Sequence, residues 1–239
     1  MRKGAEGQPK QYDLVLIHGQ GYSPLGDRPN VRGRYEMSAL QHLLRNGVTV
    51  DAVAFDGAAL FGNETPLGQV DASELSRRLT TQGNEIPIFV GTEALTSGHE
   101  LAFAKRTAEQ HGYTKILDIT TALHKPRVKT LVSQTFPRQE NGLKRVFDLL
   151  RFQTSNKPHT DGQREITVMS AEEILQNVPN HPTRKKWTIQ NILRSENDPR
   201  KIWRFAFYEI AGHGIALAPG GQRLLNTISK RFRPNPNTK

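Results

Sequence analysis

The sequence contains no cysteine among its 239 residues, so neither a disulfide framework nor a thiolate metal site can form. This absence suits a reducing compartment. No apolar run reaches the roughly 18 residues that a membrane-spanning helix needs. The polar N-terminus MRKGAEGQPKQYD also differs from the apolar core of a secretory signal. We therefore expect a cytoplasmic protein with no membrane span.

Three signatures of common enzyme classes are also missing. No Gly-x-Ser-x-Gly spacing occurs, which argues against an α/β-hydrolase. Gly19 and Gly21 lack the third glycine of a dinucleotide fingerprint. His99 and His111 are twelve residues apart and do not share a helix face, so the pattern predicts no metal site.

The formal net charge is +10, and it is concentrated at one end of the chain. Residues 184–239 hold twelve Lys or Arg against three acidic residues, which gives +9. Such a segment can attract nucleic acid or another acidic partner through long-range electrostatics. It is equally consistent with a solvated helical face that has no partner, and the usual RNA-binding signatures are absent.

Short apolar segments alternate with segments of helical periodicity through most of the chain. The predicted strands are 13–18, 48–55, 86–90, 116–119 and 165–169, and the predicted helices between them are 33–46, 71–82, 98–111 and 125–136. This alternation predicts an α/β fold, namely a Rossmann-like open parallel sheet of about five strands flanked by helices. We expect a disordered leader over residues 1–11, the Rossmann-like domain over 12–170, and a basic helical C-terminal extension over 171–239 packed on the same domain.

The strongest site candidate follows the central predicted strand. Thr120 and Thr121 end that strand, and His124 and Arg127 are three residues apart, so they are neighbours on the first turn of the next helix. Ligands of open α/β sheets bind beyond the carboxyl ends of the strands, where an imidazole and a guanidinium can share a crevice. The alternative is a helix N-terminus with two solvated basic residues.

Two further groups of residues lie at predicted strand ends. The turn Gly19-Gln20-Gly21 follows the first strand, and its backbone N–H groups can approach an anion, although it can also be only a tight turn. Asp56 and Asp71 can bind a hydrated cation or a ribose hydroxyl. They are equally interpretable as a turn residue and a helix N-cap.

The order of these motifs resembles the YdcF/SanA/ElyC-like family, a domain of unknown function with a Rossmann-like fold. The resemblance rests on Leu16 to Gly21, Arg34, Phe55-Asp56-Gly57, Asp71-Ala72, Ser97 to Leu101, and the His-x-x-Arg motif at His124 and Arg127, and it covers roughly residues 12–136. The chain departs from the family pattern in two places. Asp71 stands where the family usually has Glu, and His99-Glu100 stands where it has Glu-Asn.

The resemblance implies a small-molecule pocket, and S-adenosylmethionine or a nucleotide is a possible ligand. Our leading hypothesis is a protein that binds an anionic nucleotide-type or phosphorylated compound and has a possible group-transfer or hydrolytic activity. The candidate catalytic residues are His124 as general acid or base, with Glu100 and His99. The candidate ligand-binding residues are Gly19, Gln20, Gly21, Arg34, Asp56, Gly57, Asp71, Ser97, Thr120, Thr121 and Arg127.

Within this hypothesis, Arg34 and Arg127 clamp the anion, and Glu100 or Asp56 orients His124 or holds a ribose. One alternative is a module that binds nucleic acid or an acidic partner through residues 184–239. A second alternative is a catalytically inactive pseudo-enzyme, which the altered block from Ser97 to Glu100 suggests. The oligomeric state and the identity of the ligand do not follow from the sequence.

Overall fold

The computed structural model describes residues 11–19, 28–59, 64–137, 157–176, 178 and 214. Its elements, in chain order, are β1 (Gln11–Ile17), α1 (Val31–Arg45), β2 (Thr49–Asp56), α2 (Leu67–Thr80), β3 (Ile88–Gly91), α3 (Ser97–His111), β4 (Lys115–Thr120), α4 (Lys125–Thr135), β5 (His159–Thr160), β6 (Glu165–Ser170) and α6 (Ala171–Leu175). The fold is mixed α/β, as the alternating pattern predicts.

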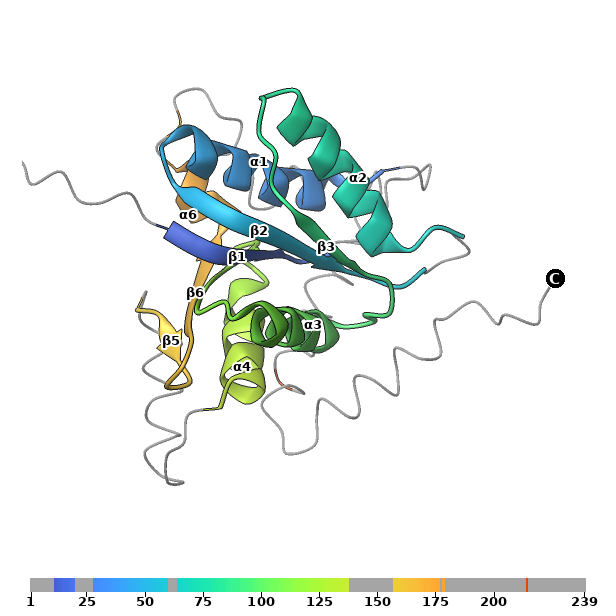
Figure 1. The fold of residues 1–239 in the computed structure, drawn as a ribbon. Helices are drawn as coiled ribbons and strands as arrows, with labels where there is room; N and C mark the ends of the chain where they lie inside the picture. Colours follow the sequence, from blue (N-terminus) through green and yellow to red (C-terminus); the bar gives the residue numbers. More distant parts are fainter. Residues whose placement is uncertain are drawn as a thin grey trace, which may run out of the picture.

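The six strands form one sheet in the order β3-β2-β1-β4-β6-β5. Every neighbouring pair is parallel except β5 and β6. Helices α1, α2 and α6 cover one face of the sheet, and α3 and α4 cover the other (Figure 1). This three-layer arrangement brings the carboxyl ends of β1, β2, β3, β4 and β6 to one edge of the sheet.

Successive side chains of β1 point to opposite faces of the sheet, so one strand contributes to both hydrophobic cores. Val15 and Ile17 pack into the core under α1, α2 and α6, whereas Leu14 and Leu16 pack into the core under α3 and α4. All four side chains are almost fully buried. A strand covered on both faces is therefore apolar at consecutive positions, which is the pattern of a parallel sheet.

The prediction of the fold class is confirmed, with two corrections of detail. The sheet has a sixth strand, because His159 and Thr160, for which no strand was predicted, pair antiparallel with Ile166 and Glu165. Helix α2 begins at Leu67, four residues before its predicted start, so the interpretation of Asp71 as an N-cap is wrong. Pro66 occupies the cap position and pre-sets the backbone for the first turn.

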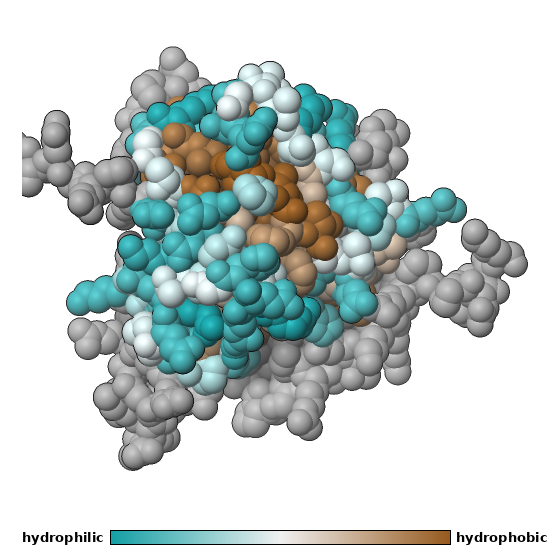
Figure 2. Space-filling model, in the orientation of Figure 1, coloured by the Kyte–Doolittle hydropathy of each residue, from teal (hydrophilic) through white to brown (hydrophobic). Residues whose placement is uncertain are grey.

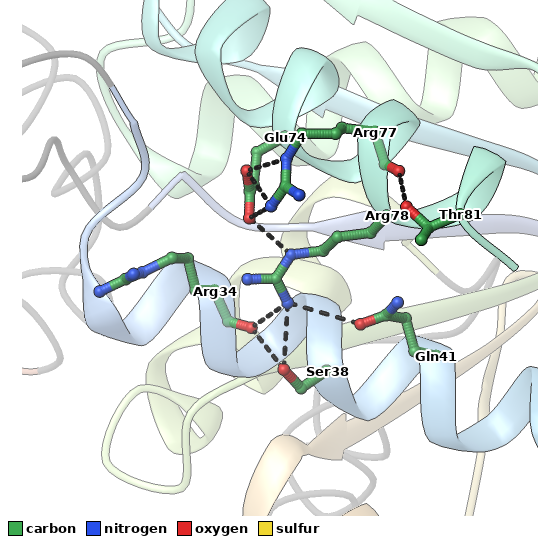
Figure 3. Close-up of polar contacts among 7 residues, drawn as sticks. All are labelled: Arg34, Ser38, Gln41, Glu74, Arg77, Arg78 and Thr81. Carbon is green, nitrogen blue, oxygen red and sulfur yellow. Dashed lines mark hydrogen bonds and ion pairs between the residues drawn. The ribbon is translucent and has the colours of Figure 1, made fainter.

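Helices α1 and α2 are joined by a polar network around Arg78 (Figure 3). The Arg78 guanidinium donates through Nε to Glu74 at 2.7 Å, and through Nη1 to the Arg34 carbonyl and the Ser38 hydroxyl, each at 3.2 Å. The Arg34 guanidinium itself extends away from this network (Figure 3). Arg78 therefore fixes the two helices against each other and leaves the Arg34 side chain outside the contact.

The edge of the sheet at β3 is the most apolar part of the visible surface. Brown side chains form a band across the middle of Figure 2, over the region of β2 and β3. Ile86 and Ile88 are only partly buried there, and Val90 is 40% exposed. In the described ranges, no helix combines the length and the apolar character needed to cross a membrane.

Candidate functional site

The candidate site lies where the order of the strands reverses. The chain runs from β1 to β2 and β3 on one side, then crosses to β4 on the other side of β1. Connections therefore diverge at the carboxyl ends of β1 and β4, and such a switch point leaves a crevice that ligands of open α/β sheets use. Four ionisable side chains and one serine gather near these two strand ends: His18, Ser97, Glu100, Asp118 and His124.

His18 follows β1 directly and is 1% exposed. Its Nδ1 lies 2.5 Å from Glu100 Oε2, and its Nε2 lies 3.1 Å from both carboxylate oxygens of Asp118. Because a carboxylate faces each ring nitrogen, both nitrogens act as donors when the ring is protonated. Burial disfavours the imidazolium, but the charges and hydrogen bonds of Asp118 and Glu100 outweigh it and raise the pKa of His18 well above 6.5.

Glu100 also fixes the start of the loop after β1. Its Oε1 accepts the backbone N–H of Gly19 at 2.7 Å. A Cβ at residue 19 would lie 2.9 Å from Leu67 Cδ2 and 3.1 Å from Glu100 Oε1, so a larger residue would displace these two side chains. The Gly19 N–H is thus used by a carboxylate of the protein itself, which corrects the prediction that it donates to a ligand.

Two more carboxyl groups are buried behind this cluster, Glu36 on α1 and Asp71 on α2. Burial, together with the neighbouring Glu100 carboxylate, raises the pKa of both groups well above its ordinary value. For Glu36 the Asp71 carboxylate acts in the same direction, while His18 and Arg32 oppose it. Asp71 Oδ1 has no hydrogen-bond partner among the residues described. Both side chains are therefore best accommodated in their neutral form.

Ser97 and His124 form the second half of the site. Ser97 begins α3 and His124 immediately precedes α4, and their Oγ and Nε2 atoms lie 2.9 Å apart. The rings of His124 and His18 meet edge to face with centroids 5.6 Å apart. The two halves thus form one cluster that joins β1, α3, β4 and α4.

The structure brings several predicted residues together. Gly19, Glu100, Ser97 and His124 are linked through the contacts above, and Thr120 and Thr121 are buried at the end of β4. Arg127 lies in the first turn of α4 and is half-buried. The proposed orientation of His124 by Glu100 or Asp56 needs correction, because the Glu100 carboxylate contacts His18 and Gly19, and the Asp56 carboxylate contacts the loop after β3.

Other predicted residues have local structural roles. Asp56 accepts the backbone N–H groups of Glu93 and Ala94, each at 3.0 Å, so it holds the loop that follows β3. His99 accepts the Leu95 N–H at 3.3 Å through Nδ1, within the start of α3. At Gly57 a Cβ would lie 2.9 Å from the Leu67 side chain, which makes this glycine a packing residue. Gln20 and Gly21 lie outside the described residues.

The sequence analysis missed His18, Asp118 and Glu36 as site residues. Asp118 could have been recognised from the sequence. An acidic residue inside the apolar strand β4 must be paired when both faces of the sheet are covered. His18 is the first polar residue after β1, at the same sheet edge. Glu36 gave no signal, since an acidic residue within a surface-like helix is ordinary.

Among the described residues, no group of three or more His, Asp or Glu side chains is arranged to hold a metal ion. Comparison of the chain with family models, with curated proteins and with solved structures gives no match. The function must therefore be inferred from the geometry of this site.

Proposed function

We propose that this protein binds an anionic small molecule, a phosphorylated or nucleotide-type compound, at the carboxyl ends of β1 and β4. The observation that carries the proposal is the buried cluster of His18, Glu100, Asp118, Ser97 and His124 at the switch point of the sheet. Buried ionisable groups are costly to a fold, and clusters with strongly shifted pKa values are concentrated at functional sites.

The backbone around this edge favours a negatively charged ligand. Helices α1, α2, α3 and α4 each follow a strand of the parallel sheet, so their N-termini all face the same edge (Figure 1). The first N–H groups of a helix have no acceptor within the helix, and the helix dipole adds a partial positive charge there. Arg127 adds a full positive charge on the first turn of α4. These N-termini and Arg127 would attract an anionic group of the ligand.

The buried carboxyl groups of Glu36 and Asp71 favour hydroxyl or amino groups on the ligand. Glu36 and Asp71 are buried acids that feel the charge of Glu100, and Asp71 Oδ1 has no partner within the described part of the chain. Carboxyl oxygens in such a position accept hydrogen bonds from hydroxyl or amino groups. A ligand that carries an anion at one end and hydroxyl groups at the other, such as a nucleotide, meets both requirements. S-adenosylmethionine, which the family resemblance suggests, is a second ligand of this kind.

Calorimetric titration of the purified full-length protein with AMP, pyrophosphate and S-adenosylmethionine tests the proposal. We expect at least one of these compounds to bind, and His124→Ala and Arg127→Ala to weaken that binding by about tenfold or more, as the loss of one charge-assisted hydrogen bond does. Arg164→Ala is the matched control, because Arg164 lies before β6 at the opposite edge of the sheet. Affinities that are equal in all four proteins would remove the assignment of the site.

The second candidate function rests on the +9 charge of residues 184–239, which lie outside the described residues except for Gly214. A nucleic-acid module of this kind binds single-stranded RNA with an affinity that falls steeply with salt. RNA binding that persists in His124→Ala and disappears at high salt, without any small-molecule binding, would favour it. Small-molecule binding without turnover would favour the pseudo-enzyme.

A further inference from the structure

Ser97 and His124 are placed as a nucleophile and its base. Ser97 Oγ lies 2.9 Å from His124 Nε2, although the two residues are 27 positions apart in the sequence. A hydroxyl within hydrogen-bond distance of an imidazole can lose its proton to the ring while the oxygen attacks an electrophile. Ser97 is 8% exposed and His124 is 5% exposed, so most of the pair is shielded from bulk water.

The start of α3 provides a favourable electrostatic environment for this oxygen. Thr96 caps the helix, and its carbonyl accepts the backbone N–H groups of His99 and Glu100. Ser97 is therefore the first residue of the helix, at the positive end of the helix dipole. Backbone N–H groups at a helix start also stabilise negative charge that develops on an attacked phosphoryl or acyl group.

An independent observation comes from the end of β4. Thr121 is 4% exposed, and its carbonyl accepts the N–H groups of both His124 and Lys125, so it anchors the turn that carries His124. Its Oγ1 atom has no hydrogen-bond partner in the described ranges. Leaving a buried hydroxyl unsatisfied is costly, which indicates that a group outside the described chain, such as a ligand oxygen, completes its bonding.

We infer that Ser97 is the nucleophile and His124 the general base in a phosphoryl transfer from a phosphate monoester or anhydride, an inference that rests on the proposed function. A bond forms between Ser97 Oγ and phosphorus while the bond from phosphorus to the leaving oxygen breaks. The leaving oxygen keeps the electron pair. His124 Nε2 takes the Oγ proton and passes it to that oxygen.

Water completes the reaction in a second step. A water oxygen attacks the phosphorus of the phosphoserine and gives a proton to His124. The bond between phosphorus and Ser97 Oγ then breaks, and His124 returns the proton to Oγ. Inorganic phosphate leaves, and the site returns to its starting state with no oxidant, reductant or second cofactor.

Covalent capture tests this inference with two probes, diisopropyl fluorophosphate and p-nitrophenyl phosphate. Diisopropyl fluorophosphate loses fluoride as its phosphorus bonds to Ser97 Oγ. Acid quenching during turnover of p-nitrophenyl phosphate traps the phosphoserine. We expect mass spectrometry to place both modifications on Ser97. Ser97→Ala removes them, and His124→Gln slows them by about 100-fold or more. Ser133→Ala leaves them unchanged, because the Ser133 hydroxyl donates to the Thr130 carbonyl within α4.

Each other outcome overturns the inference. Modification of a different residue, an unchanged rate in His124→Gln, or no modification by either probe each excludes Ser97 as the nucleophile. Calorimetry with AMP, pyrophosphate and S-adenosylmethionine separates this failure from that of the proposed function. If Ser97→Ala and the unsubstituted protein bind the same compound within about threefold while no covalent adduct forms, the ligand site stands and the nucleophile does not.

Discussion

Acidic residues at the two ends of the strands have pKa values shifted in opposite directions. We call the side of the sheet where the parallel strands begin the amino edge, and the side where they stop the carboxyl edge. At the amino edge, Asp13 accepts the N–H groups of Thr114 and Lys115, and these bonds lower its pKa. Asp161 accepts the N–H groups of its own turn and pairs with Arg164, which also lowers its pKa. These carboxylates are partly exposed, ionised and stabilising.

At the carboxyl edge the acids are buried and close to one another. Asp71 is 2% exposed, and burial together with the Glu100 charge raises its pKa. Glu36 is fully buried with the same result. Among the described residues, the acids with the most strongly raised pKa values therefore lie near the carboxyl ends of the strands, where open α/β sheets bind their ligands. The difference shows that the amino edge holds ionised, hydrogen-bonded acids and the carboxyl edge holds buried acids with raised pKa values, which is why we place the proposed function at the carboxyl edge.

The largest expected effect is from His18→Ala. Removing the imidazole leaves the Glu100 and Asp118 carboxylates buried without their shared partner, and breaking a buried ion pair in this way costs about 3 to 5 kcal/mol. Urea unfolding followed by circular dichroism measures the change. Asp13→Asn at the amino edge is the control, with an expected loss of about 1 kcal/mol. Equal losses at the two positions would contradict the contrast between the edges.

The second prediction concerns close packing at the carboxyl edge. A Cβ at Gly68 would lie 2.3 Å from the Gly91 carbonyl oxygen, a backbone atom that cannot turn aside. We expect Gly68→Ala to lower the free energy of unfolding by about 1 to 3 kcal/mol, although alanine favours helices. Gly112→Ala is the comparison, because Gly112 has φ +70° with open space around it and should cost about 1 kcal/mol. A stabilised Gly68→Ala would contradict the packing.

The third prediction is that the two edges respond to pH in opposite directions. His18, Glu36 and Asp71 have raised pKa values, so the folded state binds more protons than the unfolded chain, and stability falls as pH rises from their ordinary values of 6.5, 4.5 and 3.8 through the folded values. Asp13 and Asp161 have lowered values, and their contribution is lost only as pH falls below 3.8.

Asp71→Asn should therefore reduce the pH dependence of the unfolding free energy above about pH 4, by up to about 1.4 kcal/mol per pH unit. The measurement is a series of urea titrations from mildly acidic to alkaline pH. Asp161→Asn is the matched control and should leave that slope unchanged. A slope that is the same in Asp71→Asn and in the unsubstituted protein would show that Asp71 does not retain its proton in the fold.

The smallest expected effect is from a polar residue at the carboxyl edge that has only a structural role. Ser170 caps α6 in a reciprocal capping box with Glu173. Ser170→Ala should lower the thermal midpoint modestly, corresponding to about 1 kcal/mol, and leave the affinity for AMP or S-adenosylmethionine unchanged. Loss of ligand binding in this variant would extend the site to β6.

The sequence predicted most of the fold because its local signals agree with one another. The continuous apolar run of β1 and the apolar run of β4, which only Asp118 interrupts, are each visible within a few residues. The predicted start of α2 was wrong because Asp is a common N-cap residue, whereas Pro66 occupies the cap position and the helix begins at Leu67. The two residues of β5 are too few for any periodic signal.

The site was predicted only in part, for a different physical reason. His124, Ser97 and Glu100 lie next to helix starts, where sequence motifs are short and readable. The His18 contacts join residues 82 and 100 positions apart, and nothing local in the sequence encodes such pairings. The glycine spacing predicts that an anion binds the backbone N–H groups of the turn. It does not reveal that at Gly19 this anion is the Glu100 carboxylate.

The proposed function requires that the carboxyl ends of β1 and β4 hold an anionic small molecule. A native mass spectrum of the full-length protein purified from cells tests it most directly, with His124→Ala combined with Arg127→Ala as the site variant and Arg164→Ala as the amino-edge control. We expect a phosphorylated or nucleotide-type compound to be retained on the unsubstituted protein and on the control, and to be lost from the site variant. A compound retained equally by all three proteins, or lost only from the control, would contradict it.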